Sequence, residues 1–156
     1  MLKPLLLVAG MAVSGIAAAA PVGGVVASGT ASIGTSGSTT TINQSTAKAI
    51  INWNDFSIAN GETVNFVQPD ANAIALNRVV TATPSSIQGA LNANGQVFIV
   101  NPNGITFGST AQVNVGSLVA SAFSISDANF NAGNYQFTRI GTNANVDNFG
   151  AITTTA

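Results

Sequence analysis

The fold of this chain is indicated most clearly by residues 94–108, which read NGQVFIVNPNGITFG. Gln96–Val100 is a short and mostly apolar run of the kind that forms a buried strand. Residues 101–104 are typical of a turn, because proline fixes φ at about −65° and glycine accepts positive φ. A second short strand is expected over 104–107, and Gly108 ends it. We therefore expect two short strands joined by a tight turn.

The rest of the chain repeats this pattern of short strands and turns. Further strands are expected over residues 22–28, 31–33, 39–44, 49–53, 63–67, 73–80, 111–115, 118–120, 135–138 and 151–153. One short helix is expected over 84–91, where Pro84 resembles a helix start and Ile87, Ala90 and Leu91 share a face. The pattern predicts an all-β chain.

The composition excludes several classes of function. Charged residues make up only 6% of the 156 residues and the formal net charge is −1, which argues against nucleic-acid binding. Histidine and cysteine are absent, so disulfides, thiol nucleophiles and Cys/His zinc sites are excluded. The acidic residues lie singly, and Asp55 with Glu62, or Asp127 with Asp147, would meet only on neighbouring coils. We expect no enzymatic activity, no metal and no cofactor.

Two all-β arrangements fit this composition, a sandwich and a parallel β-solenoid. The polar strand positions hold small Ser, Thr, Gly and Asn residues, which suits the stacked coils of a solenoid. Composition leaves both arrangements open. In a solenoid, six apolar side chains are expected to stack inside along one axis: Phe66, Leu76, Phe98, Phe107, Val115 and Phe123.

Residues 1–19 are predicted to form a signal peptide. A basic start at Lys3 precedes an apolar run, and the alanines at 17–20 suit cleavage after Ala19. A membrane anchor is the alternative, but Pro21 and the following glycines interrupt the run before the roughly 20 apolar residues that a span needs. The segment predicts entry through the Sec machinery and removal by signal peptidase.

Several separate stretches resemble the N-terminal secretion domain of the filamentous haemagglutinin family, which is the TPS domain of two-partner secretion exoproteins. These stretches are 49–58, 61–66, 76–79, 119–121, 124–127 and 133–135. The most specific resemblance is an Asn-Pro-Asn-Gly-Ile motif, formed by Asn101, Pro102, Asn103, Gly104 and Ile105. The similarity extends from residue 22 to residue 137 and looks closest to the high-molecular-weight adhesin branch.

The resemblance implies a right-handed parallel β-helix with an N-terminal cap and short β-hairpin insertions, over residues 20–140. It also implies a non-catalytic secretion signal and folding cap, recognised by the periplasmic repeats of a cognate outer-membrane β-barrel transporter in a Gram-negative bacterium. The exoprotein would be secreted or surface-bound, as the head of an adhesin whose host-surface receptor is not indicated. Residues 141–156 read like the start of a further coil, as in a truncated gene product or fragment. The alternative function is a free-standing secreted β-solenoid module that binds glycans or surfaces.

The residues that the resemblance singles out each have two interpretations. The motif Asn101 to Ile105 is either a structural turn or a direct contact of the transporter. Asn77 and Arg78 are candidate transporter contacts, although Arg78 could instead cap a coil carbonyl or pair with Asp70. Trp53 and Phe56 are expected in the core or the cap, the alternative being an exposed patch for a partner.

Overall fold

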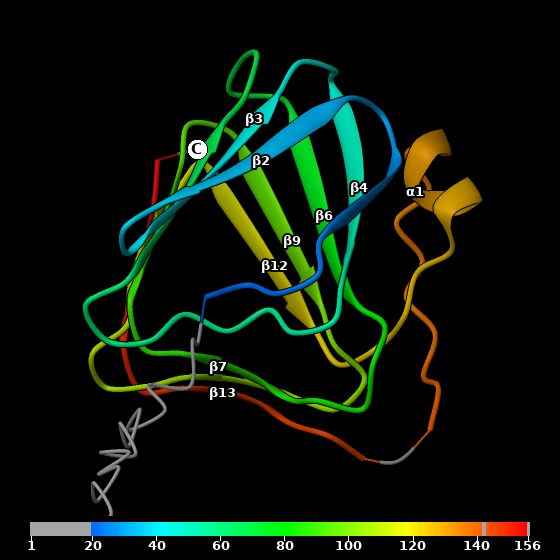
Figure 1. The fold of residues 1–156 in the computed structure, drawn as a ribbon. Helices are drawn as coiled ribbons and strands as arrows, with labels where there is room; N and C mark the ends of the chain where they lie inside the picture. The colour runs from blue at the N-terminus through cyan, green and yellow to red at the C-terminus, as the bar shows by residue number, and fades with distance from the viewer. Residues whose placement is uncertain (1–19, 142, 156) are drawn as a thin grey trace, which may run out of the picture.

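Short strands wind into a parallel β-solenoid in the computed structural model, which describes residues 20–141 and 143–155 (Figure 1). The strands are β1 (Val25–Ser28), β2 (Ala31–Ser36), β3 (Thr39–Gln44), β4 (Lys48–Trp53), β5 (Thr63–Val67), β6 (Ile74–Val79), β7 (Ser85–Ile87), β8 (Ala90–Ala93), β9 (Gln96–Val100), β10 (Ile105–Phe107), β11 (Gln112–Val115), β12 (Ser117–Ser121), β13 (Val146–Asn148) and β14 (Ala151–Thr154). A single short helix in this range, α1 (Asp127–Ala132), lies outside the coils. The solenoid is confirmed over the sandwich, and the predicted signal peptide lies outside the described residues.

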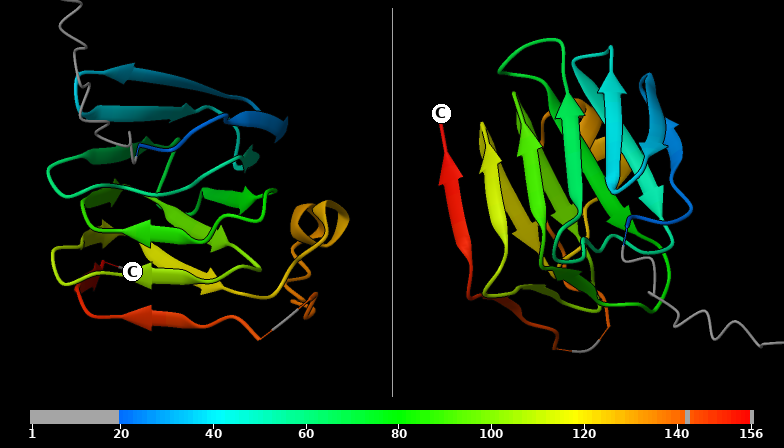
Figure 2. Two further views of the ribbon diagram at one scale, coloured as in Figure 1. Left: turned by 60° about the horizontal axis from the view of Figure 1, so that its bottom comes forward. Right: turned by 60° about the vertical axis from the view of Figure 1, so that its left-hand side comes forward.

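Three coils follow the cap, and a fourth coil is interrupted by residues 122–145. The first coil holds β4 and β5, the second β6, β7 and β8, and the third β9, β10 and β11. The strands pair in parallel and in register, so that Ile50, Leu76 and Phe98 form one column. The fourth coil begins with β12 and ends with β13 and β14. Figure 2 shows the coils stacked in sequence order, with α1 beside the stack.

The first strands close the N-terminal end of the stack. β1 pairs with β4 and β2 pairs with β3, both in antiparallel orientation. The one antiparallel hairpin among the described strands is this β2–β3 pair, so the expected hairpin belongs to the cap and is not inserted between coils. The cap covers strand edges that would otherwise be free to pair with another chain.

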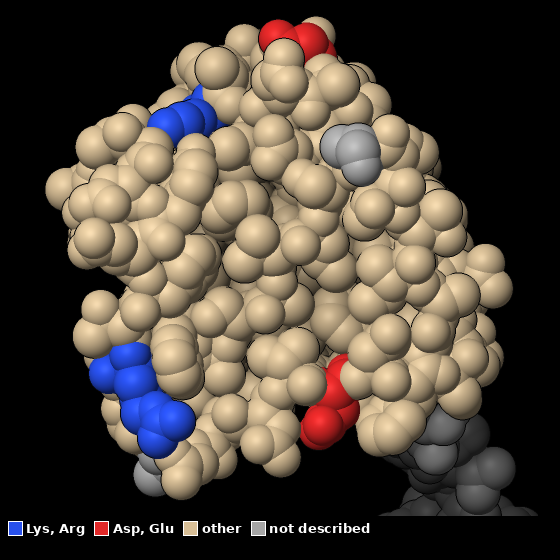
Figure 3. Space-filling view, turned by 180° about the vertical axis from the view of Figure 1, so that it is seen from behind, with Lys and Arg blue, Asp and Glu red and all other residues tan. Residues whose placement is uncertain are grey.

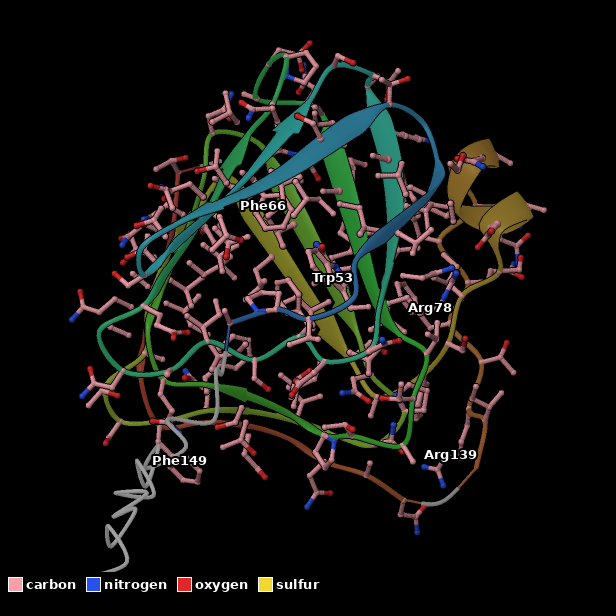
Figure 4. The ribbon with its side chains drawn as sticks, in the orientation of Figure 1. Trp53, Phe66, Arg78, Arg139 and Phe149 are labelled. Atoms are coloured by element: carbon pink, nitrogen blue, oxygen red, sulfur yellow. The ribbon has the colours of Figure 1, made fainter. Side chains whose placement is uncertain are left out.

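The inside of the coils is filled by apolar side chains. Phe66, Phe107 and Val115 lie there as predicted, each at most 2% exposed. Trp53 and Phe56 are 1% and 0% exposed with ring centroids 5.6 Å apart, so the prediction of core residues is confirmed and the exposed patch is wrong. Figure 4 shows Trp53 inside the coils. Each such buried side chain contributes about 1.5–3 kcal/mol.

The other three side chains predicted to stack inside do not. Leu76 and Phe98 point to the outer face of their sheet, because they stand one residue away from the inward-facing Ala75 and Val97. They belong to a second apolar cluster with Ile50. Phe123 lies outside the coils and is 39% exposed.

The predicted helix over 84–91 is wrong, since these residues form β7 and β8. β7 pairs with β10, and β8 lies between β5 and β11. All of these pairings are parallel. Ile87 and Leu91 are both buried inside the coil. Pairing with strands of neighbouring coils therefore overrides a weak local helix signal. The predicted strand over 135–138 is reduced to one isolated bridge, between Ser124 and Thr138.

Residues 122–140, which we call the strap, leave the stack after β12. The strap carries α1, whose N-cap Ser126 accepts a hydrogen bond of 3.1 Å from the Asn129 backbone N–H. It lies along the outer face of the sheet formed by β1, β4, β6, β9 and β12 (Figures 1 and 2). Within the described ranges, no helix has the length and apolar character needed to cross a membrane.

Candidate functional site

The Asn-Pro-Asn-Gly segment forms a tight turn between β9 and β10. The Gly104 N–H donates to the Asn101 carbonyl at 3.0 Å and closes the turn. The Asn101 side chain is 0% exposed and points into the fold. Its amide donates to the Thr83 carbonyl at 2.9 Å and to the Ser85 hydroxyl at 3.0 Å, both on the second coil. Asn101 therefore joins the turn to the coil before it.

Asn103 lies on the outer side of the same turn. Its backbone N–H donates to the Asn101 Oδ1 at 2.9 Å, and its side-chain amide donates to the Thr81 carbonyl at 2.7 Å. Gly104 has a φ of +107°, a conformation that a residue with a side chain adopts only under strain. Ile105 begins β10 and is 1% exposed. Only Pro102 and Asn103 of the motif therefore offer appreciable surface to a partner of the folded domain.

The turn also holds both ends of the segment that interrupts the fourth coil. The Asn101 N–H donates to the Ser121 carbonyl at 3.0 Å, where β12 ends. The Ile105 N–H donates to the Asn145 carbonyl at 3.1 Å, just before β13 begins. Residues 122–145 thus start and finish over the two ends of the motif turn.

A pocket of about 410 Å³ opens beside the motif. Pro102 and Asn103 form one wall, Val80 follows β6, and Ser124 and Ile140 come from the strap. Val80 and Ile140 are 56% and 49% exposed, so the pocket is open to solvent and largely apolar.

Asn77 lies inside the coil and not on the surface. Its side chain is 0% exposed, and its Oδ1 accepts a hydrogen bond of 2.9 Å from the Trp53 indole. Its amide donates to the Phe98 carbonyl at 3.3 Å. Any transporter contact with this side chain would therefore require an unfolded chain.

Arg78 lies on the outer face of β6, between the sheet and the strap (Figure 4). The guanidinium donates to the Ile125 carbonyl at 2.7 Å and to the Asn52 Oδ1 at 3.2 Å, and it forms an ion pair of 2.7 Å with Asp127. Arg78 caps a carbonyl as predicted, but this carbonyl belongs to the strap and not to a coil, and the predicted pairing with Asp70 is wrong. Asp70 instead accepts a hydrogen bond from the Asn72 N–H in its own loop.

Charged side chains are sparse on the surface. Figure 3 shows one face with a broad uncharged area, and the blue and red atoms lie towards its margin. Over residues 20–141 and 143–155, no three His, Cys, Asp or Glu side chains lie close enough to hold a metal ion. The features that stand out chemically are the motif turn, its adjoining pocket and the Arg78 cluster.

Comparison with known proteins identifies the family to which this fold belongs. The family model described as the TPS secretion domain matches residues 17–156. The chain belongs to the TPS secretion domain family. The family resemblance expected from the Asn-Pro-Asn-Gly-Ile motif is therefore confirmed, and with it the assignment as a secretion domain of a two-partner-secreted exoprotein.

The relatives of this TPS secretion domain are longer proteins. Two heme/hemopexin-binding proteins from Haemophilus influenzae are 40% identical over 121 residues and 42% identical over 99 residues. These matches cover 76% and 64% of the chain but only 13% and 11% of the relatives. The crystal structure of the HMW1 secretion domain from Haemophilus influenzae matches with a TM-score of 0.82 and 40% identity, over 85% of this chain and 36% of that one. The shared part is thus a minor portion of each larger protein.

The residues that hold the strap of this TPS domain were not predicted from the sequence. Lys48 and Asp127 were not singled out for this role, yet both fix α1. A signal was available, because β4, β6 and β9 carry large apolar side chains on the outer face (Ile50, Leu76 and Phe98) as well as apolar side chains on the inner face. Strands of that kind are covered on both sides.

Proposed function

We propose that this chain directs the export of a two-partner-secreted exoprotein by binding the periplasmic repeats of a cognate outer-membrane β-barrel transporter. The observation that carries the proposal is the TPS family match over residues 17–156. The exoprotein would pass through the periplasm of a Gram-negative bacterium to the cell surface or the medium. The domain would act as a signal and a folding cap, without catalysis, and an adhesin would be the passenger.

Residues 1–19 would act as the signal peptide in this route. Their basic start, apolar run and small residues suit the Sec machinery and signal peptidase. Cleavage after Ala19 would release a chain that starts immediately before the described cap. N-terminal sequencing of the exported protein would test this position, and a chain that retains Lys3 would contradict it.

The motif would serve the export route mainly through folding. Asn101 is fully buried, and its side-chain amide and backbone N–H donate to Thr83, Ser85 and Ser121 on two other segments, which supports a structural role. Asn103, Pro102 and the adjoining pocket are the part of the motif that a transporter could touch on the folded domain. Arg78 is only 16% exposed, so its proposed contact with the transporter is weaker than that of Asn103.

Export of the tagged full chain, with and without a co-expressed transporter of this family, tests the proposal. We expect the chain in the medium only when the transporter is present. A transporter that lacks its periplasmic repeats is the control and should leave the chain in the periplasm. Retention with the cognate transporter present would contradict the proposal and favour a free-standing binding module.

The two motif asparagines separate folding from contact. Asn101→Ala and Asn103→Ala would be compared with Asn114→Ala, which removes an exposed amide from β11. We expect export of Asn101→Ala to fall together with the free energy of unfolding. If Asn103→Ala loses export although its stability falls by no more than about 1 kcal/mol, the contact role is supported. If Asn103→Ala keeps export, that role is excluded.

A further inference from the structure

The strap reaches back over coils that lie far from it in the sequence. It leaves the stack after β12, yet the Asn131 side chain donates to the Ser28 hydroxyl on β1 at 3.1 Å. Between these ends, Ile125 and Phe130 pack on outward-facing side chains of β4, β6 and β9. In a simple solenoid each coil touches only its neighbours. The strap breaks that rule by touching the cap and all three coils.

Two cations from different coils fix the two ends of α1. At the N-terminal end, Arg78 of the second coil binds Asp127 and the Ile125 carbonyl. At the C-terminal end, Lys48 of the first coil donates to the Phe130 and Asn131 carbonyls at 3.1 and 3.2 Å. Positive charge at the C-terminal carbonyls of a helix is stabilising.

The remaining cation of the described chain also belongs to the strap. The Arg139 guanidinium lies 5.3 Å from the centre of the Phe123 ring, within the strap itself. Lys48 in addition lies 5.5 Å from the centre of the Tyr135 ring. All three Lys and Arg side chains in the part that the structure describes therefore contact the strap, whereas the coil interior is held by apolar packing.

The strap buries the aromatic centre of the second apolar cluster. Phe98 of the third coil lies 5.8 Å from Phe130, 5.3 Å from Tyr135 and 6.3 Å from Phe137, measured between ring centroids. All three partners come from the strap. Phe98 is 4% exposed although it points away from the coil interior, and the strap residues packed on it provide this burial. The outer face of this sheet is therefore completed by chain that follows β12.

We propose that the strap is a latch that closes after β12 has joined the stack and couples the cap and the three coils into one cooperative folding unit. This order of folding follows from the contacts of the strap. The strap lies C-terminal to β12, and its partners lie on the cap and on every earlier coil. Its contacts with β1, β4, β6 and β9 cannot form until those strands are stacked. Without the latch, neighbouring coils would open one after another, as in other repeat proteins. The proposal concerns the folded domain and does not depend on the transporter.

Native-state hydrogen exchange of the full chain, read by mass spectrometry, tests the coupling. In the unmodified chain, amides of β4, β6, β9 and β12 should be protected to the same extent, because they open together. Phe130→Ala removes a side chain that is 0% exposed and should open the strap. Protection in β12 should then fall about a hundredfold below that in β4.

Two further variants keep this test decisive. Phe149→Ala removes a phenylalanine that is 69% exposed outside the strap and should leave the protection uniform. Lys48→Met keeps the apolar stem and removes the positive charge beside the α1 carbonyls. Protection in β12 should then fall about tenfold below that in β4. Unequal protection in the unmodified chain, or an equal loss in all strands of Phe130→Ala and Lys48→Met, would overturn the proposal.

Pulse-labelled refolding tests the order of closure. Amides of β4, β6 and β9 should become protected before those of α1. Fluorescence gives a second readout of the same order. The single Trp, Trp53, monitors the coil interior, and the single Tyr, Tyr135, monitors the strap. Protection of α1 before β9 would show that the strap does not close last, and would overturn this part of the proposal.

Discussion

The indole N–H of Trp53 donates a hydrogen bond of 2.9 Å to the Oδ1 of Asn77, and both side chains are buried inside the coil. The Asn77 amide continues to the Phe98 carbonyl, so one polar side chain links the first, second and third coils. Among the described residues, every buried side-chain polar atom has a hydrogen-bond partner. Asn77 is therefore a buried polar residue whose hydrogen bonds are satisfied inside the coil, and replacing it should lower the free energy of unfolding.

Asn77→Ala is expected to lower the free energy of unfolding by about 2–4 kcal/mol, because it leaves the Trp53 N–H unpaired and a void beside it. Urea unfolding followed by Trp53 fluorescence measures this loss. Asn114→Ala is the matched control, since Asn114 is exposed on β11 and its removal should cost less than about 0.5 kcal/mol. Equal losses in the two variants would contradict the assigned role of Asn77.

Asn101→Ala is expected to destabilise the domain by about 2–3 kcal/mol, because the Ser85 hydroxyl, the Thr83 carbonyl and the Asn103 N–H all lose a partner. Asn103→Ala should cost about 1 kcal/mol, since its side chain lies at the surface of the turn. Thermal unfolding of the two purified variants measures the difference. A larger loss for Asn103→Ala would reverse the roles given to these residues.

Gly116→Ala is expected to cost about 1–3 kcal/mol, since its Cβ would lie 2.6 Å from the Gly95 carbonyl oxygen on the coil above. The clash is with backbone and no side chain can turn away to relieve it. Gly34→Ala is the control, because nothing lies within 4 Å of a Cβ there and the change should be neutral or stabilising by up to about 1 kcal/mol. Urea midpoints compare the two, and an unaffected Gly116→Ala would contradict the tight stacking.

Arg78→Lys is expected to cost about 1–2 kcal/mol, because a single ammonium cannot reach Asn52, Ile125 and Asp127 together. Asp127→Asn should cost at most about 1 kcal/mol, since the carboxylate is half exposed. Unfolding in low salt and in about 0.5 M NaCl separates the two effects, because salt screens the ion pair more than the carbonyl contact. A loss for Arg78→Lys that vanishes in salt would reduce Arg78 to a surface ion pair.

Strands could be predicted from the sequence where a short apolar run is followed directly by a tight turn. The segments around Gln96–Val100 and the Asn-Pro-Asn-Gly turn match the structure closely. The helix predicted over 84–91 failed because β7 and β8 are selected by neighbouring coils and not by local propensity. α1 was missed because six residues carry little periodic signal, although its Ser126 cap is readable in hindsight.

The candidate site was predictable in its residues but not in their exposure. Turn residues are expected at the surface, yet stacking encloses Asn101 between the second and fourth coils. Asn77 stands next to Arg78, and strand alternation sends one inward and the other outward. The partner of Arg78 is Asp127, and sequence distance gave no sign of a contact that depends on the strap.

The motif turn spans the two ends of residues 122–145, and the fourth coil resumes beyond them in unbroken register, Ile105 opposite Val146 and Gln112 opposite Ala151. The register of the fourth coil is therefore set by the two points at which the intervening segment leaves and rejoins the stack, whereas the strap within that segment supplies contacts to the other coils. This junction is a suitable site for inserting a foreign loop. We expect a foreign loop added after the strap, with its ends still held over 101–105, to lie on the side of the stack and to preserve both the strap contacts and the register of the coils.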